Sequence, residues 1–129
     1  MARVTIDSSD AKRTAATLDT AGQAISEGVA AVVKKAAVNI KKGAAKRASG
    51  LAHAPAYPRA ITFDFAAGLT GPYAEIGPDK GRPQGALGNL LEYGSENNAP
   101  IPHLAPALEA EGPAFERYLE EAVLKGLGL

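Results

Sequence analysis

The sequence has no cysteine and no tryptophan, and only seven of its 129 residues are phenylalanine or tyrosine. Without cysteine the chain can form neither disulfides nor thiolate metal sites. Its two histidines, His53 and His103, are far apart and do not form the i,i+4 pair of a helical metal site. Because many of the apolar residues are alanine, we expect a shallow core of Ala, Val, Leu and Ile in one domain that spans residues 1–129.

The chain also lacks long apolar runs and the sequence patterns of common catalytic sites. No apolar run approaches the roughly 20 residues of a membrane-spanning helix, and the N-terminus lacks the apolar core of a signal peptide. We therefore expect no membrane association and synthesis in the cytoplasm. Gly81, Gly85 and Gly88 are followed by no Lys-Ser/Thr pair, so no phosphate-binding loop is predicted. We expect no enzymatic activity, no bound metal and no cofactor.

The net charge is zero, but the charges are unevenly distributed along the chain. Residues 1–59 contain ten Lys/Arg and four Asp/Glu, a balance of +6, whereas residues 60–129 contain four and ten, a balance of −6. One interpretation is chance clustering on solvated surfaces. The other is that the basic half of one copy meets the acidic half of the next, as in a head-to-tail ring.

Apolar periodicity predicts a long helix from about Asp10 to Ser49. On a helical wheel its apolar positions fall within one arc of roughly 100°: Leu18, Gly22, Ile25, Val29, Val32, Val33, Ala36 and Ile40. The opposite arc carries five lysines, here called the basic face: Lys34, Lys35, Lys41, Lys42 and Lys46. The basic face is either a solvated outer surface or a contact for an anionic partner, which would be DNA phosphates or a neighbouring copy. No aromatic residues or Arg/Asn/Gln cluster accompany it, so base-specific reading is not predicted.

Short alternating patterns predict strands at residues 3–6, 60–65 and 70–76. Residues 79–85 should form an exposed, mobile polar loop, and residues 86–93 are either a strand or a short helix followed by a strand. A closing helix is predicted over residues 103–127, bent or restarted at Gly112-Pro113. The fold class is therefore α+β: a long N-terminal helix, a small antiparallel sheet of about three to four strands and a C-terminal helix.

The narrowest pattern lies before the closing helix. It comprises two segments, here called the motif: Glu92, Tyr93, Gly94 and Ser95, then Pro100, Pro102, His103, Leu104, Pro106 and Ala107. The pattern indicates a strand that ends in a glycine turn, crosses a proline-stiffened loop and enters a helix. Gly94 is predicted to supply a backbone conformation that a side chain would forbid, Ser95 to stabilise a turn, and Tyr93 to pack in the corner. A plain strand–turn–helix corner gives the same pattern.

This motif resembles one in small neck proteins of long-tailed, lambdoid-type bacteriophages, the head–tail joining or tail-completion family. In that family a long basic helix is followed by a small sheet, the motif strand and a terminal helix. His103 stands where the family usually has Phe, so it should pack as a flat ring with a polar edge. The family's Thr-Gly after the long helix is missing from residues 53–59, and the loop over residues 77–88 is unusual.

The resemblance implies a structural virion protein of the neck, assembled in the host cytoplasm. Its copies would form a six-fold ring that contacts connector or stopper proteins on one side and tail proteins on the other. Genome DNA would pass through the lumen without being read. The alternative is a small basic-helix nucleic-acid-binding protein without sequence specificity. A ring would have a mass far above 13.2 kDa, whereas a DNA binder would show steep salt dependence as an isolated protein.

Overall fold

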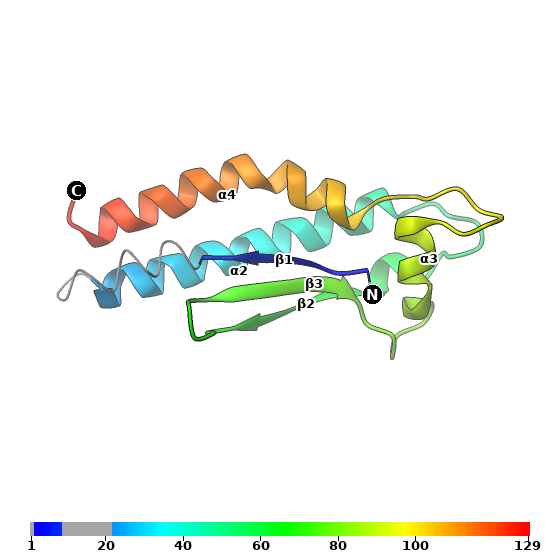
Figure 1. The fold of residues 1–129 in the computed structure, drawn as a ribbon, viewed down its shortest axis with the longest axis horizontal. Helices are drawn as coiled ribbons and strands as arrows, with labels where there is room; N and C mark the ends of the chain where they lie inside the picture. Colours follow the sequence, from blue (N-terminus) through cyan, green and yellow to red (C-terminus); the bar gives the residue numbers. More distant parts are fainter. Residues whose placement is uncertain (1, 9–21) are drawn as a thin grey trace.

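The computed structural model describes residues 2–8 and 22–129, and it shows two long helices packed on a small sheet (Figure 1). The elements run in this order: β1 (Val4–Asp7), α2 (Gly22–Arg47), η1 (Tyr57–Ala60), β2 (Ile61–Ala66), β3 (Tyr73–Pro78), η2 (Gly85–Leu87), α3 (Gly88–Tyr93) and α4 (Leu104–Gly126), where η marks a 3-10 helix. The predicted α+β class is confirmed, with a long helix, a three-stranded antiparallel sheet and a C-terminal helix.

The sheet has the order β1-β3-β2, and both strand pairs are antiparallel. β2 and β3 form a hairpin in which Phe63 lies opposite Ile76, and on the other side of β3 Val4 lies opposite the same Ile76. Strand β3 is therefore central, and its Ala74 and Ile76 are fully buried. α2 packs against β2 and β3, whereas α4 reaches β1.

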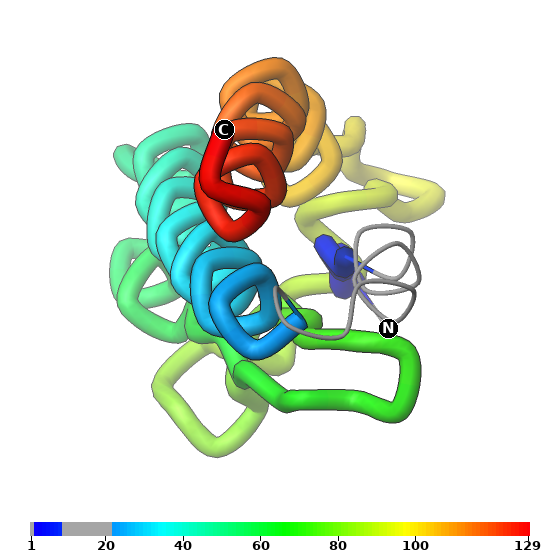
Figure 2. The backbone as a smooth tube through the Cα atoms, turned by 90° about the vertical axis from the view of Figure 1, so that its left-hand side faces the viewer, coloured from blue at the N-terminus to red at the C-terminus, as the bar shows by residue number. Residues whose placement is uncertain are grey.

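α2 and α4 lie side by side and run in opposite directions, as the end-on view also shows (Figures 1 and 2). Small residues bring the two backbones close together. A Cβ on Gly28 would lie 3.3 Å from the Ala122 Cβ, and a Cβ on Gly126 would collide with Ile25. The helix-weakening effect of a glycine inside α2 is thus offset by close packing against α4.

The predicted apolar arc of α2 forms the core, since Ile25, Val29, Val33 and Ile40 are buried. Val32 is only half-buried, because it lies at the edge that faces α4, and Leu18 falls outside the described residues. Alanines supply about half of the core cluster, which confirms the expectation of a shallow core. Tyr57 is the largest fully buried side chain.

One prediction of local structure was wrong and another was wrong in part. Residues 85–93 contain no strand, because they form η2 and α3, so Glu92 and Tyr93 end a helix. A glycine with positive φ ends a helix as readily as a strand, and six residues are too few to reveal a helical period. The predicted restart of the closing helix at Gly112-Pro113 does not occur, because α4 is continuous through the exposed Pro113. The part of the predicted long helix before Gly22 lies outside the described residues.

Candidate functional site

The two segments of the motif meet in one buried corner between α3 and α4. Glu92, only 6% exposed, accepts hydrogen bonds at Oε1 from the backbone N–H groups of His103 (3.1 Å) and Leu104 (2.8 Å). Its Oε2 lies 3.5 Å from the Ala105 nitrogen. The residue at the N-cap of α4 makes no side-chain capping bond of its own. The Glu92 carboxylate therefore caps α4 from another helix, where a negative charge also complements the helix dipole.

His103 is fully buried and is bonded through both ring nitrogens. Its Nδ1 lies 2.9 Å from the Ile101 carbonyl oxygen and 3.2 Å from Glu92 Oε1, whereas Nε2 lies 2.6 Å from the Tyr57 hydroxyl. Because only acceptors face Nδ1, that nitrogen carries a hydrogen, and in the tautomer with that hydrogen alone Nε2 accepts the Tyr57 O–H. The predicted packing of His103 as a flat ring with a polar edge is confirmed.

Tyr57 completes the corner from η1. Its ring meets the His103 ring edge to face, with centroids 5.1 Å apart and an interplanar angle of 89°. Burial, and secondly the nearby charge of Glu92, raise the pKa of Tyr57 far above its ordinary value, so the hydroxyl remains a donor. Tyr57 was not predicted from the sequence. Its signal was a lone aromatic between Pro55 and Pro58, in an alanine-rich stretch of a chain with few aromatics.

A carboxylate, an imidazole and a phenol in line are the components of a proton relay, but the Tyr57 and His103 side chains have no exposed surface. A substrate could not contact them unless the corner opened. Within the described residues every buried side-chain nitrogen and oxygen has a hydrogen-bond partner. The arrangement therefore fixes the direction in which α4 leaves the loop.

Gly94 and Ser95 form the turn that returns the chain toward α4. Gly94 has φ +76°, and a Cβ there would lie 2.7 Å from the Pro100 nitrogen and 2.8 Å from the Asn98 oxygen. This confirms its predicted conformation. The backbones of Ser95 and Asn98 exchange two hydrogen bonds, and the Asn98 amide donates to Ser95 Oγ at 3.2 Å. Ser95 thus has the turn role that the sequence predicted.

The motif residues divide into a buried group and a surface group. Glu92, His103, Leu104 and Ala107 are buried, and Pro106 is half-buried. Ser95, Pro100 and Pro102 are exposed, as is Tyr93 at 67%. The prediction that Tyr93 packs in the corner was wrong, because α3 buries the side that carries Glu92 and the next residue points about 100° away.

The five lysines of the basic face do not form one uniform surface. Lys34 lies over the Phe65 ring of β2, with Nζ 4.6 Å from the ring centroid, whereas Lys35 lies beside α4. Lys41 is half-buried and the other four are exposed. No carboxylate within residues 2–8 and 22–129 lies within 4.0 Å of these ammonium groups. On α4 the exposed acids are Glu109, Glu116, Glu120 and Glu121.

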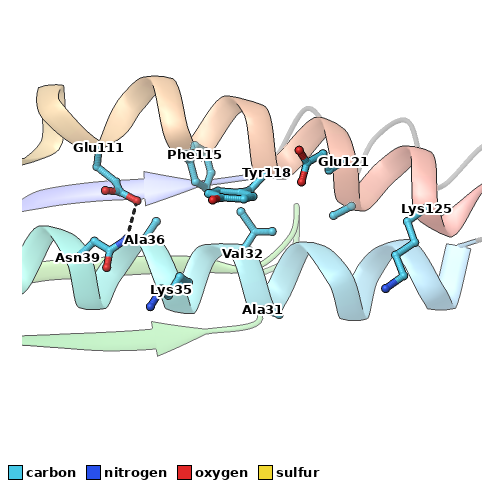
Figure 3. Close-up of a pocket in the computed structure, with 11 residues that line it drawn as sticks. Ala31, Val32, Lys35, Ala36, Asn39, Glu111, Phe115, Tyr118, Glu121 and Lys125 are labelled. Atoms are coloured by element: carbon cyan, nitrogen blue, oxygen red, sulfur yellow. Dashed lines mark hydrogen bonds between the residues drawn. The ribbon is translucent and has the colours of Figure 1, made fainter.

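A groove of about 480 Å³ runs between α2 and α4 (Figure 3). Its apolar lining includes Val32, Phe115 and Tyr118, and its charged residues come from both helices: Lys35, Glu111, Glu121 and Lys125. The Asn39 amide donates to Glu111 Oε1 at 3.0 Å across one end of the groove. The groove therefore carries both signs of charge around an apolar centre.

Neither a metal site nor a membrane helix emerges from the described residues. Residues 2–8 and 22–129 contain no cluster of three His, Asp or Glu side chains that could hold a metal ion. The helices of this part of the chain are too short or too polar to cross a bilayer. Comparison of the chain with protein-family models, curated proteins and solved structures found no match.

Proposed function

We propose that this protein is a structural subunit of the neck of a long-tailed bacteriophage. Its copies form a closed six-fold ring at the head–tail junction, between connector or stopper proteins and the tail. Genome DNA passes through the ring without being read. The observation that carries this proposal is the corner in which both motif segments meet, with Glu92 capping α4 at 2.8 and 3.1 Å.

A joint of this kind suits a subunit that repeats around a ring. Each subunit must present its two contact surfaces at a fixed angle, because an angular error is repeated at every interface and prevents closure. The Glu92 cap and the buried Tyr57–His103 pair hold α4 relative to α3 and η1. Two of the motif residues that carry the resemblance to the phage family, Glu92 and His103, thus help to set the angle between α4 and the rest of the subunit.

The distribution of charge gives further support. Lysines without carboxylate partners lie on α2, and exposed glutamates lie on α4, within the described residues. A neighbouring copy that brings its α4 toward α2 would pair opposite charges. Each exposed pair contributes only about 0–1 kcal/mol, so the effect depends on repetition around the ring.

The proposal is tested by inactivating the gene in the phage or prophage that encodes it. We expect DNA-filled heads and separate, unjoined tails in electron micrographs, with joined particles restored by the wild-type gene supplied in trans. Mass spectrometry of purified virions should detect the protein. Joined, infectious particles that form without it would refute the neck assignment.

Non-specific nucleic-acid binding is the second candidate, and it is favoured by the lysines of α2, which have no carboxylate partner within the described residues. Duplex DNA titrated with the isolated protein would then show an affinity whose logarithm falls linearly with the logarithm of salt concentration, with a slope of about −0.9 per neutralised phosphate. Steep salt dependence, together with absence of the protein from virions, would support this candidate over the ring.

A further inference from the structure

The turn between β2 and β3 presents a leucine that the protein itself does not bury. Leu69 is the most exposed of the large apolar side chains in the described residues. Its neighbours from Ala67 to Pro72 carry no charge. Single exposed apolar residues are common on protein surfaces, so exposure alone indicates little. The construction of the turn adds a second observation.

The Leu69 turn is closed by two glycines with positive φ and is tied down at its base by a buried hydrogen bond. Gly68 has φ +55°, and a Cβ there would collide with the Gly71 carbonyl oxygen and approach the Tyr73 ring. Gly71 has φ +135°. At the base of the turn the Ser8 hydroxyl donates to the Pro72 carbonyl oxygen at 2.9 Å. The Ser8 hydrogen bond restrains the base of the turn and so reduces the conformational entropy that the turn would lose when Leu69 binds.

An apolar pocket of about 600 Å³ lies near the opposite end of the molecule, between α3, residues 51–54 and residues 98–101. Its apolar walls come from Leu51, Leu87, Leu90, Leu91 and Ile101. No Lys, Arg, Asp or Glu lines it. The groove between α2 and α4, by contrast, is lined by four charged side chains, so an uncharged leucine turn fits it less well.

We propose that the Leu69 turn of one copy inserts into this apolar pocket, which contains Leu90, of the next copy. Both surfaces are uncharged, so their contact desolvates no ion, and each is apolar at its centre. The β2–β3 turn and α3, whose leucines line the pocket, lie toward opposite ends of the long axis (Figure 1), which makes the contact head-to-tail. Head-to-tail contacts build closed rings when the rotation between copies closes. The inference rests on the proposed function, because it specifies the contact that builds the proposed ring.

Two matched pairs of variants test the contact. Leu69→Asp removes the inserted side chain, and Leu129→Asp is its control, since Leu129 is 85% exposed at the far C-terminus. Leu90→Glu places a charge in the pocket, and Leu124→Glu is its control, since the two leucines are 44% and 41% exposed. Circular dichroism verifies that all four variants fold.

Sedimentation velocity over a concentration series measures self-association. Leu69→Asp and Leu90→Glu should each weaken it about 10- to 100-fold, as expected from losing the burial of one leucine, whereas the two controls should match the wild type. Wild-type protein that remains monomeric at the highest attainable concentration would overturn the inference. So would wild-type association in both Leu69→Asp and Leu90→Glu, or equal weakening in the controls.

Mixing the two defective variants tests the direction of the contact. The Leu69→Asp copy keeps an intact pocket and the Leu90→Glu copy keeps an intact turn, so an equimolar mixture should form one-to-one pairs and stop there. A mixture that stays monomeric would contradict the insertion. Association through Leu69 in a protein that is absent from virions would uphold the contact and reject the neck function. Rings that form in joined virions of the Leu69→Asp variant would uphold the neck function and reject the Leu69 contact.

Discussion

Replacing Glu92 with alanine removes the carboxylate that caps α4. Two backbone donors, the N–H groups of His103 and Leu104, then remain buried without an acceptor. Hydrogen bonds to a charged group contribute about 1.5–3 kcal/mol each, and loss of a helix cap usually costs about 0.5–2 kcal/mol. The variant no longer has to remove a carboxylate from water when it folds, and this partly offsets the loss of the hydrogen bonds. We therefore expect the free energy of unfolding to fall by about 2–4 kcal/mol.

Urea unfolding followed by circular dichroism at 222 nm measures this loss. With a urea m-value of about 2 kcal/mol/M, the midpoint should fall by about 1–2 M. Glu92→Gln keeps an acceptor oxygen without the charge, so its loss should be about half as large. Glu96→Ala is the control, since Glu96 is an exposed acid in the adjacent turn and should change stability by less than about 0.5 kcal/mol. A Glu92→Ala variant as stable as Glu96→Ala would refute the capping role.

Three further predictions concern the corner and the basic face. Because the pKa of Tyr57 is raised on folding, wild-type stability should fall as the pH rises above about 10, where the unfolded tyrosine ionises. Tyr57→Phe should lose less stability between pH 8 and pH 10.5 in urea titrations. Gly94→Val should cost about 2 kcal/mol or more, because of its positive φ and the contact with Pro100, whereas Ser95→Ala should cost less than about 0.5 kcal/mol in thermal melts. Reversing three lysines to glutamate should slow or prevent ring formation at temperatures at which circular dichroism shows the variant to be folded, as electron microscopy would show; normal rings would mean that the basic face is only solvated. The three are Lys34, Lys41 and Lys42.

The helices and strands with long periodic patterns could be predicted from the sequence. The apolar arc of α2 extends over several helical turns, so only a helical period fits it. The alternation in β2 has a period of two, which repeats three times within its six residues. α3 has only six residues, and both a strand and a helix were compatible with them. The wrong prediction for Tyr93 followed from that ambiguity. In a helix the Tyr93 side chain points away from the buried side that carries Glu92, and it is therefore exposed.

The polar corner could be predicted only in part. Gly94 and Ser95 act through local backbone geometry, which residue type reveals directly. Glu92 and Tyr57 act across 12 and 46 positions, on Leu104 and His103 respectively, and one sequence carries no signal for such pairs. A buried glutamate also contradicts the usual surface preference of that residue. Only the folded backbone shows why the charge is stable there: it is placed against the free N–H groups of α4, where the helix itself supplies the compensating donors.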